Sequence, residues 1–143
     1  MEWKKEEYVV SDDKAKLQLN AIHEFLTHSY WSKGVSEAIV KKSIENSLTF
    51  GLYKGVEQIG FAKMITDKAT FAYLADVFVL EKHQGHGLGK WLVECTMSHP
   101  DLQGLRRIML ATRDAQKLYE KLGFTPLHAP ERFMQVWNPN VYQ

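Results

Sequence analysis

The chain has 143 residues, a length that predicts one compact domain over residues 1–143. Hydrophobic residues make up 45%, charged residues 24%, and the formal net charge is +1, so the composition gives no basis for a nucleic-acid or a membrane partner. No apolar run approaches the roughly 20 residues that span a bilayer, and the first residues carry mixed charge, unlike a secretory leader, so we expect a cytoplasmic protein. A single cysteine, Cys95, excludes an internal disulfide, and its helical surroundings predict a buried, inert thiol.

Apolar periodicity and turn residues predict a chain in which strands and helices alternate. In chain order these are a strand at 8–10, a helix from an N-cap at Ser11 or Asp12 to Leu26, a helix from Ser36 to Leu48, strands at 48–53, 58–66 and 71–80, a helix at 88–97, a strand at 107–112, a helix at 114–122, and strands at 124–127 and 133–137. Short turns at 54–55 and 67–68 make the three middle strands an antiparallel meander. The predicted fold class is therefore α/β (α+β), a mixed, mostly antiparallel sheet with helices on both faces.

Three glycines in five residues, Gly85, Gly87 and Gly89, lie between the third strand of this meander and the helix that follows. Glycine lets the backbone turn sharply and approach a ligand, and the first N–H groups of a helix have no partner within the helix. Together with the positive end of the helix dipole they favour an anion such as a phosphate. A tight turn between strand and helix would use the same residues.

The glycine spacing fits neither of two common phosphate-binding motifs. A dinucleotide fingerprint counted from Gly85 needs a glycine where Lys90 stands, and in a P-loop four residues, not three, would separate Gly85 from Gly89. Both motifs also occur in parallel β–α–β units, whereas this strand is predicted to belong to an antiparallel meander.

The pattern Gln84-x-x-Gly87-x-Gly89 resembles the Q/R-x-x-G-x-G/A signature of the GCN5-related N-acetyltransferase (GNAT) family. The strand before it, the helix after it and the later segment 111–124 match the family in order and spacing. The resemblance implies a sheet splayed around acetyl-CoA as co-substrate, and direct transfer of acetyl to a primary amine of a small molecule, without a covalent enzyme intermediate. A non-catalytic acyl-CoA-binding or sensing module and a protein or peptide amine acetyltransferase remain alternatives.

The resemblance also implies which residues hold acetyl-CoA. Loop amides would bind the pyrophosphate, backbone N–H groups of the splayed strand would bind the pantetheine arm and the acetyl carbonyl, and a hydroxyl stands where the family often has an asparagine. These residues are Val77, Phe78, Val79, Gln84, Gly85, His86, Gly87, Leu88, Gly89, Lys90, Thr112 and Tyr119.

Two side chains are catalytic candidates, Tyr119 and Asp76. Tyr119 matches the family tyrosine beside the coenzyme A sulfur, where a phenol can protonate the departing thiolate; the alternative is a packing tyrosine on an amphipathic helix. Asp76 interrupts an apolar strand, and a buried carboxylate needs a partner. It would bind a cationic amine or relay its proton, or would form an internal salt bridge.

The acceptor amine arrives protonated and needs a base or a water chain to lose its proton. Substrate-side candidates are Asp76, Tyr73, Trp31, Tyr30 and His28, with His23 and Glu24 as further bases. His83 and His86 lie three apart on a glycine-rich loop, and no ligand cluster with zinc spacing follows them, so a metal site is not expected. The sequence leaves open whether two copies form a homodimer.

Overall fold

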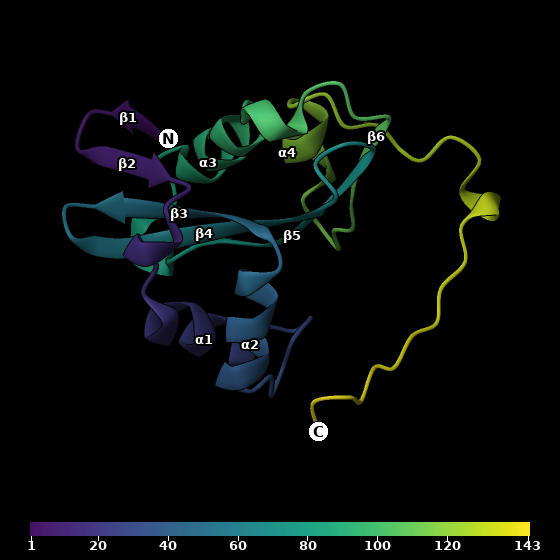
Figure 1. Ribbon diagram of the computed structural model, residues 1–143, viewed down its shortest axis with the longest axis horizontal. Coiled ribbons are helices and arrows are strands. Elements are labelled where there is room, and N and C mark those ends of the chain that lie inside the picture. The colour runs from purple at the N-terminus through teal and green to yellow at the C-terminus, as the bar shows by residue number, and fades with distance from the viewer.

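The computed structural model describes residues 1–143 as a single sheet with helices on both faces (Figure 1). The elements, in chain order, are β1 (Glu2–Lys5), β2 (Tyr8–Ser11), α1 (Leu19–Thr27), α2 (Glu37–Glu45), β3 (Leu48–Lys54), β4 (Glu57–Thr66), β5 (Phe71–Val79), α3 (Leu88–Met97), β6 (Arg107–Leu110) and α4 (Gln116–Glu120), with single 3-10 turns at Lys14–Lys16, Glu81–His83, Pro100–Leu102 and Pro130–Arg132. None of the helices combines the length and the apolar character needed to cross a membrane.

The six strands lie in sequence order, and every neighbouring pair is antiparallel except β5 and β6, which run parallel. The mixed sheet is therefore as predicted. The description of β5 as only part of a meander is incomplete, because β5, α3 and β6 also form a parallel β–α–β crossover. Strand β1, whose residues are mostly charged and exposed, was not predicted.

Strand β4 lies in the middle of the sheet and is buried on both faces from Gln58 to Met64. On one face, a core that includes Ala62 and Met64 packs against α3. On the other, Phe61 and Phe78 pack against α1 and α2. In Figure 1, α3 and α4 lie above the sheet and α1 and α2 below it. This two-sided burial explains the continuous apolar run of the strand.

The sheet opens where β5 and β6 separate. Their ladder ends at Leu74 and Leu110, yet β5 continues to Val79. On its other side β5 stays paired with β4, although the register shifts between Phe61 and Lys63. Asp76 lies at this irregularity with a φ of 55°, a bulge conformation that re-aims the strand. The edge of β5 beyond Leu74 is consequently free on the β6 side.

The direction of the N–H groups along this free edge follows from one hydrogen bond. The N–H of Leu80 donates to the carbonyl of Ile59 at 2.8 Å, toward β4. Successive residues of a strand point their N–H groups to opposite edges. The N–H groups of Val79 and Val77 therefore point away from β4, into the opening.

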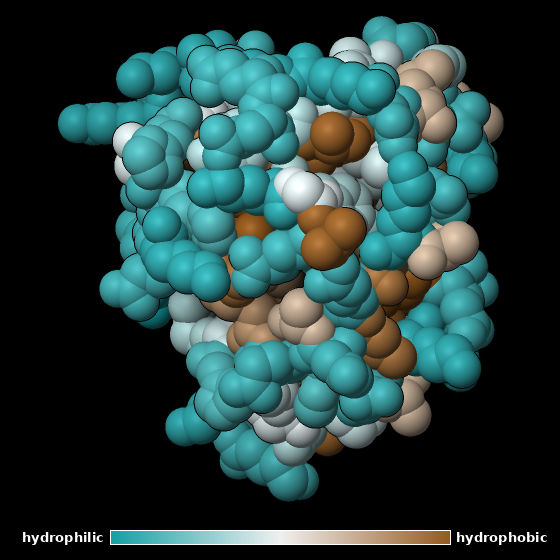
Figure 2. Space-filling view, turned by 90° about the vertical axis from the view of Figure 1, so that its left-hand side faces the viewer, coloured by the Kyte–Doolittle hydropathy of each residue, from teal (hydrophilic) through white to brown (hydrophobic).

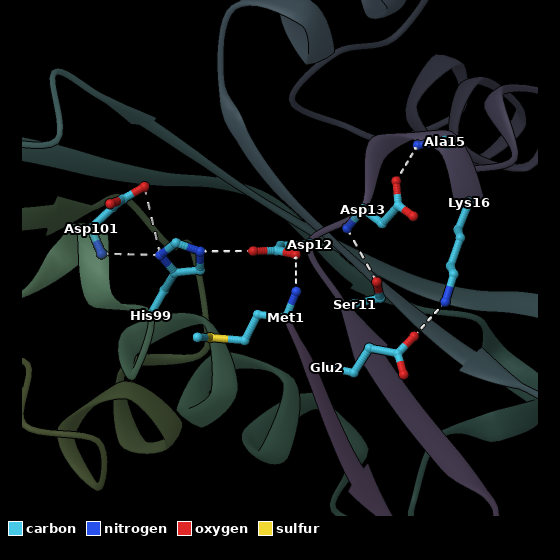
Figure 3. A network of polar contacts seen from close by, with 9 residues as sticks. All are labelled: Met1, Glu2, Ser11, Asp12, Asp13, Ala15, Lys16, His99 and Asp101. Carbon is cyan, nitrogen blue, oxygen red and sulfur yellow. Dashed lines mark hydrogen bonds and ion pairs between the residues drawn. The ribbon is translucent and has the colours of Figure 1, made fainter.

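A polar network joins the N-terminal hairpin to the turn after α3 (Figure 3). Asp12 accepts hydrogen bonds from the N-terminal ammonium of Met1 and pairs with His99, both at 2.8 Å, and His99 Nδ1 accepts from the N–H of Asp101. Burial alone would raise the pKa of Asp12, but the hydrogen bonds from the N-terminus and from His99 outweigh it, and the net pKa is lowered. Asp12 is thus held as a carboxylate.

The first helix begins later than predicted. Asp13, not Ser11 or Asp12, accepts a hydrogen bond from the N–H of Ala15 and closes a 3-10 turn. Gln18 then bonds to Gln58 of β4 before α1 starts at Leu19. Ser36, in contrast, caps α2 as predicted, accepting from the N–H of Ile39 at 3.2 Å.

Two predicted strands, 124–127 and 133–137, do not form in the structure. Residues 124–128 run beside β6 without pairing with it, and residues 133–138 are extended with no ladder partner. Figure 1 shows this last segment (yellow) running away from the body of the molecule. Both predictions were wrong because a strand pattern describes the segment alone, whereas a strand also needs a neighbour.

Figure 2 looks onto the end of the sheet at the left of Figure 1, where β3 ends. Hydrophilic residues (teal) cover most of this face, and hydrophobic residues (brown) are visible between them. Scattered apolar atoms of this kind are normal for a folded surface.

Candidate active site

A cavity of about 440 Å³ lies where the free edge of β5 meets the start of α3 and the helix α4. Ten of the residues predicted to hold acetyl-CoA line it: Val77, Phe78, Val79, Gln84, Gly85, Gly87, Leu88, Gly89, Lys90 and Tyr119. Phe25, Ala115 and Leu118 complete the wall. Segments predicted separately from the sequence are thus brought to one place.

The glycine loop has the backbone conformation that an anion site needs. Gly85 and Gly87 have φ values of +86° and +73°, and a Cβ on either would meet no atom within 4 Å. The reason for glycine is therefore the backbone angle, not crowding. Gln84 donates from Nε2 to the carbonyl of Val79 at 2.8 Å and fixes the loop to the end of β5.

Gly87 is the N-cap of α3, a helix of ten residues. The first intrahelical bond runs from Trp91 to the carbonyl of Gly87. The preceding N–H groups, those of Leu88, Gly89 and Lys90, have no acceptor within the helix. They lie at the cavity and provide donors for a phosphate.

Tyr119 reaches the same cavity from α4, on the opposite side from the loop. Its side chain is half-buried, and its ring packs edge-on against Phe124 at 5.8 Å. Burial, and secondarily the nearby Tyr30, raise the pKa of the Tyr119 phenol. The phenol consequently stays protonated and available as a hydrogen-bond donor.

Asp76 is paired on both of its oxygens. Oδ1 accepts from the indole N–H of Trp31 at 2.8 Å, and Oδ2 lies 2.7 Å from Nζ of Lys63. The side chains of Lys63 and Asp76 are only 9% and 11% exposed. The internal salt bridge that the sequence left open is therefore present, and it anchors the aromatic loop to β5.

Lys63 was missed at the sequence level, although a signal existed. It is a lysine in the middle of an otherwise apolar strand, as Asp76 is an aspartate in the next one. A charge buried in one strand needs an opposite charge nearby, and the two strands were already predicted to be neighbours. From this the sequence could have predicted that Lys63 and Asp76 face each other across the hairpin.

The loop between α1 and α2 bridges the two sides of the opening. Trp31 contacts Asp76 on β5, while the Arg113 guanidinium, beyond β6, lies 3.9 Å from the ring centre of Tyr30. Phe25 stacks on Phe78 at 4.0 Å below the loop. The two aromatic residues predicted on the acceptor side thus lie over the opening.

Other predicted residues lie elsewhere. His86 is exposed and outside the cavity, Thr112 caps the turn before α4 by accepting from the N–H of Ala115, and Tyr73 lies in the paired part of β5. Among the base candidates, His23 bonds to the carbonyl of Val35, and His28 lies beside Glu24 on the exposed face of α1.

Two further observations concern Cys95 and the side chains that could act as metal ligands. Cys95 is buried in α3, and burial raises the pKa of its thiol to about 11, which makes it a poor nucleophile. The structure gathers no group of three or more histidine, cysteine, aspartate or glutamate side chains that could hold a metal ion.

Comparison with known proteins agrees with this arrangement. The family model described as an acetyltransferase (GNAT) domain matches residues 45–126. A Gibberella zeae protein provisionally named an acetyltransferase is 35% identical, covering 83% of this chain and 79% of that protein. A crystal structure from Xanthomonas campestris pv. campestris, provisionally assigned to the GNAT family, is 46% identical with a TM-score of 0.92, covering 94% of this chain and 96% of that one.

A GNAT family acetyltransferase from Elizabethkingia anophelis, solved with acetyl-CoA bound, shares the fold at 16% identity, with a TM-score of 0.67 over 87% of this chain and 80% of that one. The family model matches more than half of the chain, and two relatives are more than 30% identical to it over most of its length. The chain therefore belongs to the GNAT family of acetyltransferases, as its sequence predicts.

Proposed function

We propose that this protein is an acetyl-CoA-dependent N-acetyltransferase that acts on a primary amine of a small molecule. The observation that carries the proposal is the cavity of about 440 Å³ that joins the free edge of β5, the glycine loop and Tyr119. Anion donors, free strand amides and a protonated phenol meet there in the order in which a phosphate, an extended arm and a thioester would need them.

The residues that line this cavity suit the chemical groups of coenzyme A. The open space beside Gly85 and Gly87 leaves room for a pyrophosphate against the backbone, and the first turn of α3 supplies N–H donors. The N–H groups of Val79 and Val77 are free to pair with an extended chain as a neighbouring strand would. The relative from Elizabethkingia anophelis, which has acetyl-CoA bound on the same fold, supports this assignment.

Bound acetyl-CoA would supply a thioester, and the amine, after losing one proton to water, would attack its carbonyl carbon. The carbon–sulfur bond would then break, and a second proton from the nitrogen would pass to the Tyr119 oxygen after that residue has protonated the sulfur. The N–H of Val77 is the donor we assign to the carbonyl oxygen, where negative charge develops. Tyr119 is the acid that donates its phenolic proton to the departing sulfur. Its raised pKa keeps that proton in place until then.

The acceptor side favours a small, cationic amine. Trp31 and Tyr30 cover the opening, which leaves little access for a folded protein surface, and aromatic rings attract cations. Each oxygen of Asp76 keeps a second lone pair with which to accept from an ammonium group. We assign Asp76 to binding the amine and to fixing the loop that covers it.

A coupled assay of thiol release over a panel of amines tests the proposal. Wild type should release coenzyme A only when both acetyl-CoA and a suitable small amine are present. Tyr119→Phe should lower kcat by roughly 100-fold, the usual contribution of a general acid, with little change in acetyl-CoA affinity.

Three classes of acceptor should be compared: polyamines, amino acids and peptides with a free N-terminus or lysine. Release with peptides alone would favour a protein acetyltransferase. Binding of acetyl-CoA by calorimetry without release for any acceptor would favour a sensing module. Equal kcat for Tyr119→Phe and wild type would remove Tyr119 from the mechanism.

A further inference from the structure

Five aromatic side chains form a continuous row that leads from the core of the sheet into the loop between α1 and α2. Neighbouring ring centres are 6.1 Å apart between Phe61 and Phe78, 4.0 Å between Phe78 and Phe25, 6.1 Å between Phe25 and Trp31, and 5.1 Å between Trp31 and Tyr30. Phe25 also lines the cavity proposed for acetyl-CoA. This aromatic row therefore joins the cavity to the loop that covers the opening.

The aromatic row ends at a positive charge. The guanidinium carbon of Arg113, in the segment between β6 and α4, lies 3.9 Å from the ring centre of Tyr30. A guanidinium that stacks on a ring keeps its N–H groups at its edge, where they remain free to donate. The carboxylate within 4 Å of Arg113 is that of Asp114, at 3.9 Å, and both side chains are mostly exposed, so this ion pair contributes little. Arg113 thus presents a fork of donors without a strong partner.

The Arg113 guanidinium lies beside the proposed active site. Its segment leads directly into Ala115, which lines the acetyl-CoA cavity. Burial first, and then the nearby Tyr30, raise the pKa of the Tyr119 phenol, so Tyr30 lies within electrostatic reach of the proposed acid. Arg113 is therefore within reach of an acceptor whose amine attacks a thioester beside Tyr119.

The carboxylate on the other side of the opening is already neutralised. Nζ of Lys63 lies 2.7 Å from Oδ2 of Asp76, and little of either side chain is exposed. Asp76 can accept a hydrogen bond from an ammonium group, but the pair has no net negative charge to attract a second one. A diamine would bring its second ammonium toward Arg113, which repels it. An acceptor with an anionic group in that place is attracted instead.

We propose that Arg113 binds an anionic group, a carboxylate or a phosphate, that the acceptor itself carries. The acceptor is then a small molecule with its amine next to Asp76, its anion next to Arg113 and its apolar middle over the rings of Trp31 and Tyr30. A guanidinium fork matches two oxygens of either anion. This inference rests on the proposed acetyltransferase function and narrows its acceptor class.

The two polar ends of this site are separated by the aromatic pair. Asp76 accepts from the indole N–H of Trp31, Arg113 stacks on Tyr30, and the centres of the two rings are 5.1 Å apart. In an α-amino acid one carbon atom carries both the amine and the carboxylate, which lie too close together to reach both ends. The geometry therefore favours a terminal amine that several carbon atoms separate from the anion.

Pairs of amines that differ only in the anionic group test the inference. Lysine is compared with cadaverine, γ-aminobutyrate with propylamine, and aminopropyl phosphate with aminopropanol, each with acetyl-CoA in the assay of thiol release. Wild type should prefer the anionic member of at least one pair by roughly 10- to 100-fold in kcat/KM, the contribution of a hydrogen bond between charged groups. A preference in the first two pairs identifies a carboxylate acceptor, and one in the third pair a phosphate acceptor.

Arg113→Gln should reduce this preference to a ratio of about one, because glutamine has neither the charge nor the fork. The ratio within a pair cancels any general effect of the substitution on the loop, since both amines meet the same variant. Arg106→Gln is the matched control. Arg106 is exposed and precedes β6, at the opposite end of that strand from Arg113, so its variant should keep the wild-type ratio.

The outcomes separate this inference from the proposed function. Equal kcat/KM for both members of every pair in wild type, or a preference that survives Arg113→Gln, would overturn the anion site and leave the acetyltransferase function standing. Release of coenzyme A with none of the amines would contradict that function and this inference with it.

Discussion

Asp76 shows how much one residue does in this structure. Its left-handed backbone forms the irregularity of β5, and its carboxylate holds both Lys63 and Trp31. Aspartate tolerates this conformation better than most residues. A single side chain thus connects the opening of the sheet to the loop that covers it.

Replacing Asp76 by asparagine should strongly destabilise the protein. The amide would leave the buried ammonium group of Lys63 without its counter-charge, which typically costs about 3–5 kcal/mol in the free energy of unfolding. Urea unfolding of Asp76→Asn and wild type measures the difference. Asp114→Asn is the matched control, since that carboxylate is 74% exposed, and it should change stability by less than about 0.5 kcal/mol. An equal loss of unfolding free energy in the two variants would show that the buried ion pair stabilises the protein no more than an exposed carboxylate does.

Among the residues, the sequence predicted which residues lie together around the cavity better than it predicted the contacts of Asp76 and the histidines. The glycines, Gln84 and Tyr119 lie together as expected. A sequence motif predicts such residues well because it describes a short, continuous stretch of backbone. The partner of Asp76 could not be read from its own strand, since it depends on register across a hairpin. His23 bonds to the carbonyl of Val35 and His28 to the carbonyl of Glu24, contacts that no spacing rule predicts.

At the scale of elements, the start of α3 joins fold and ligand binding. Gly87→Ala would force alanine into a left-handed conformation that costs about 1–2 kcal/mol, although no atom lies in the way of its Cβ. The loop should then prefer other conformations, and we expect acetyl-CoA affinity to fall about tenfold by calorimetry.

Gly89→Ala is the control for that change. Gly89 lies inside α3 without a positive φ, and an added Cβ would meet only Val79 Cγ2, at 3.9 Å. Alanine should stabilise the helix by about 0.5–1 kcal/mol and leave binding nearly unchanged, since the family signature admits it. If Gly89→Ala weakened binding as much as Gly87→Ala, backbone conformation would not be the reason for the glycines.

The elements also show where local patterns are sufficient. The helix α2 with its Ser36 cap and the hairpins between β3, β4 and β5 follow from periodicity and turns alone. The charged strand β1 was missed because its pairing with β2, not its composition, makes it a strand. The segment 133–137 has the composition of a strand and no partner within its chain.

At the scale of the whole molecule, two cavities border the last two strands of the sheet. On the inner side the free edge of β5 faces the proposed acetyl-CoA cavity, and on the outer side of β6 lies a second cavity of about 680 Å³. Apolar periodicity and turn residues predicted the mixed sheet correctly, but not that residues 133–137 would lie outside it.

Hydrogen exchange of the full chain with and without acetyl-CoA tests the central claim most directly. We predict binding at one site per chain, with slower exchange at the amides of Val77 and Val79 and in the segment 85–90, and no comparable change in β1 or β2. Failure to bind acetyl-CoA, or binding that leaves the Val77, Val79 and loop amides unprotected, would contradict the account.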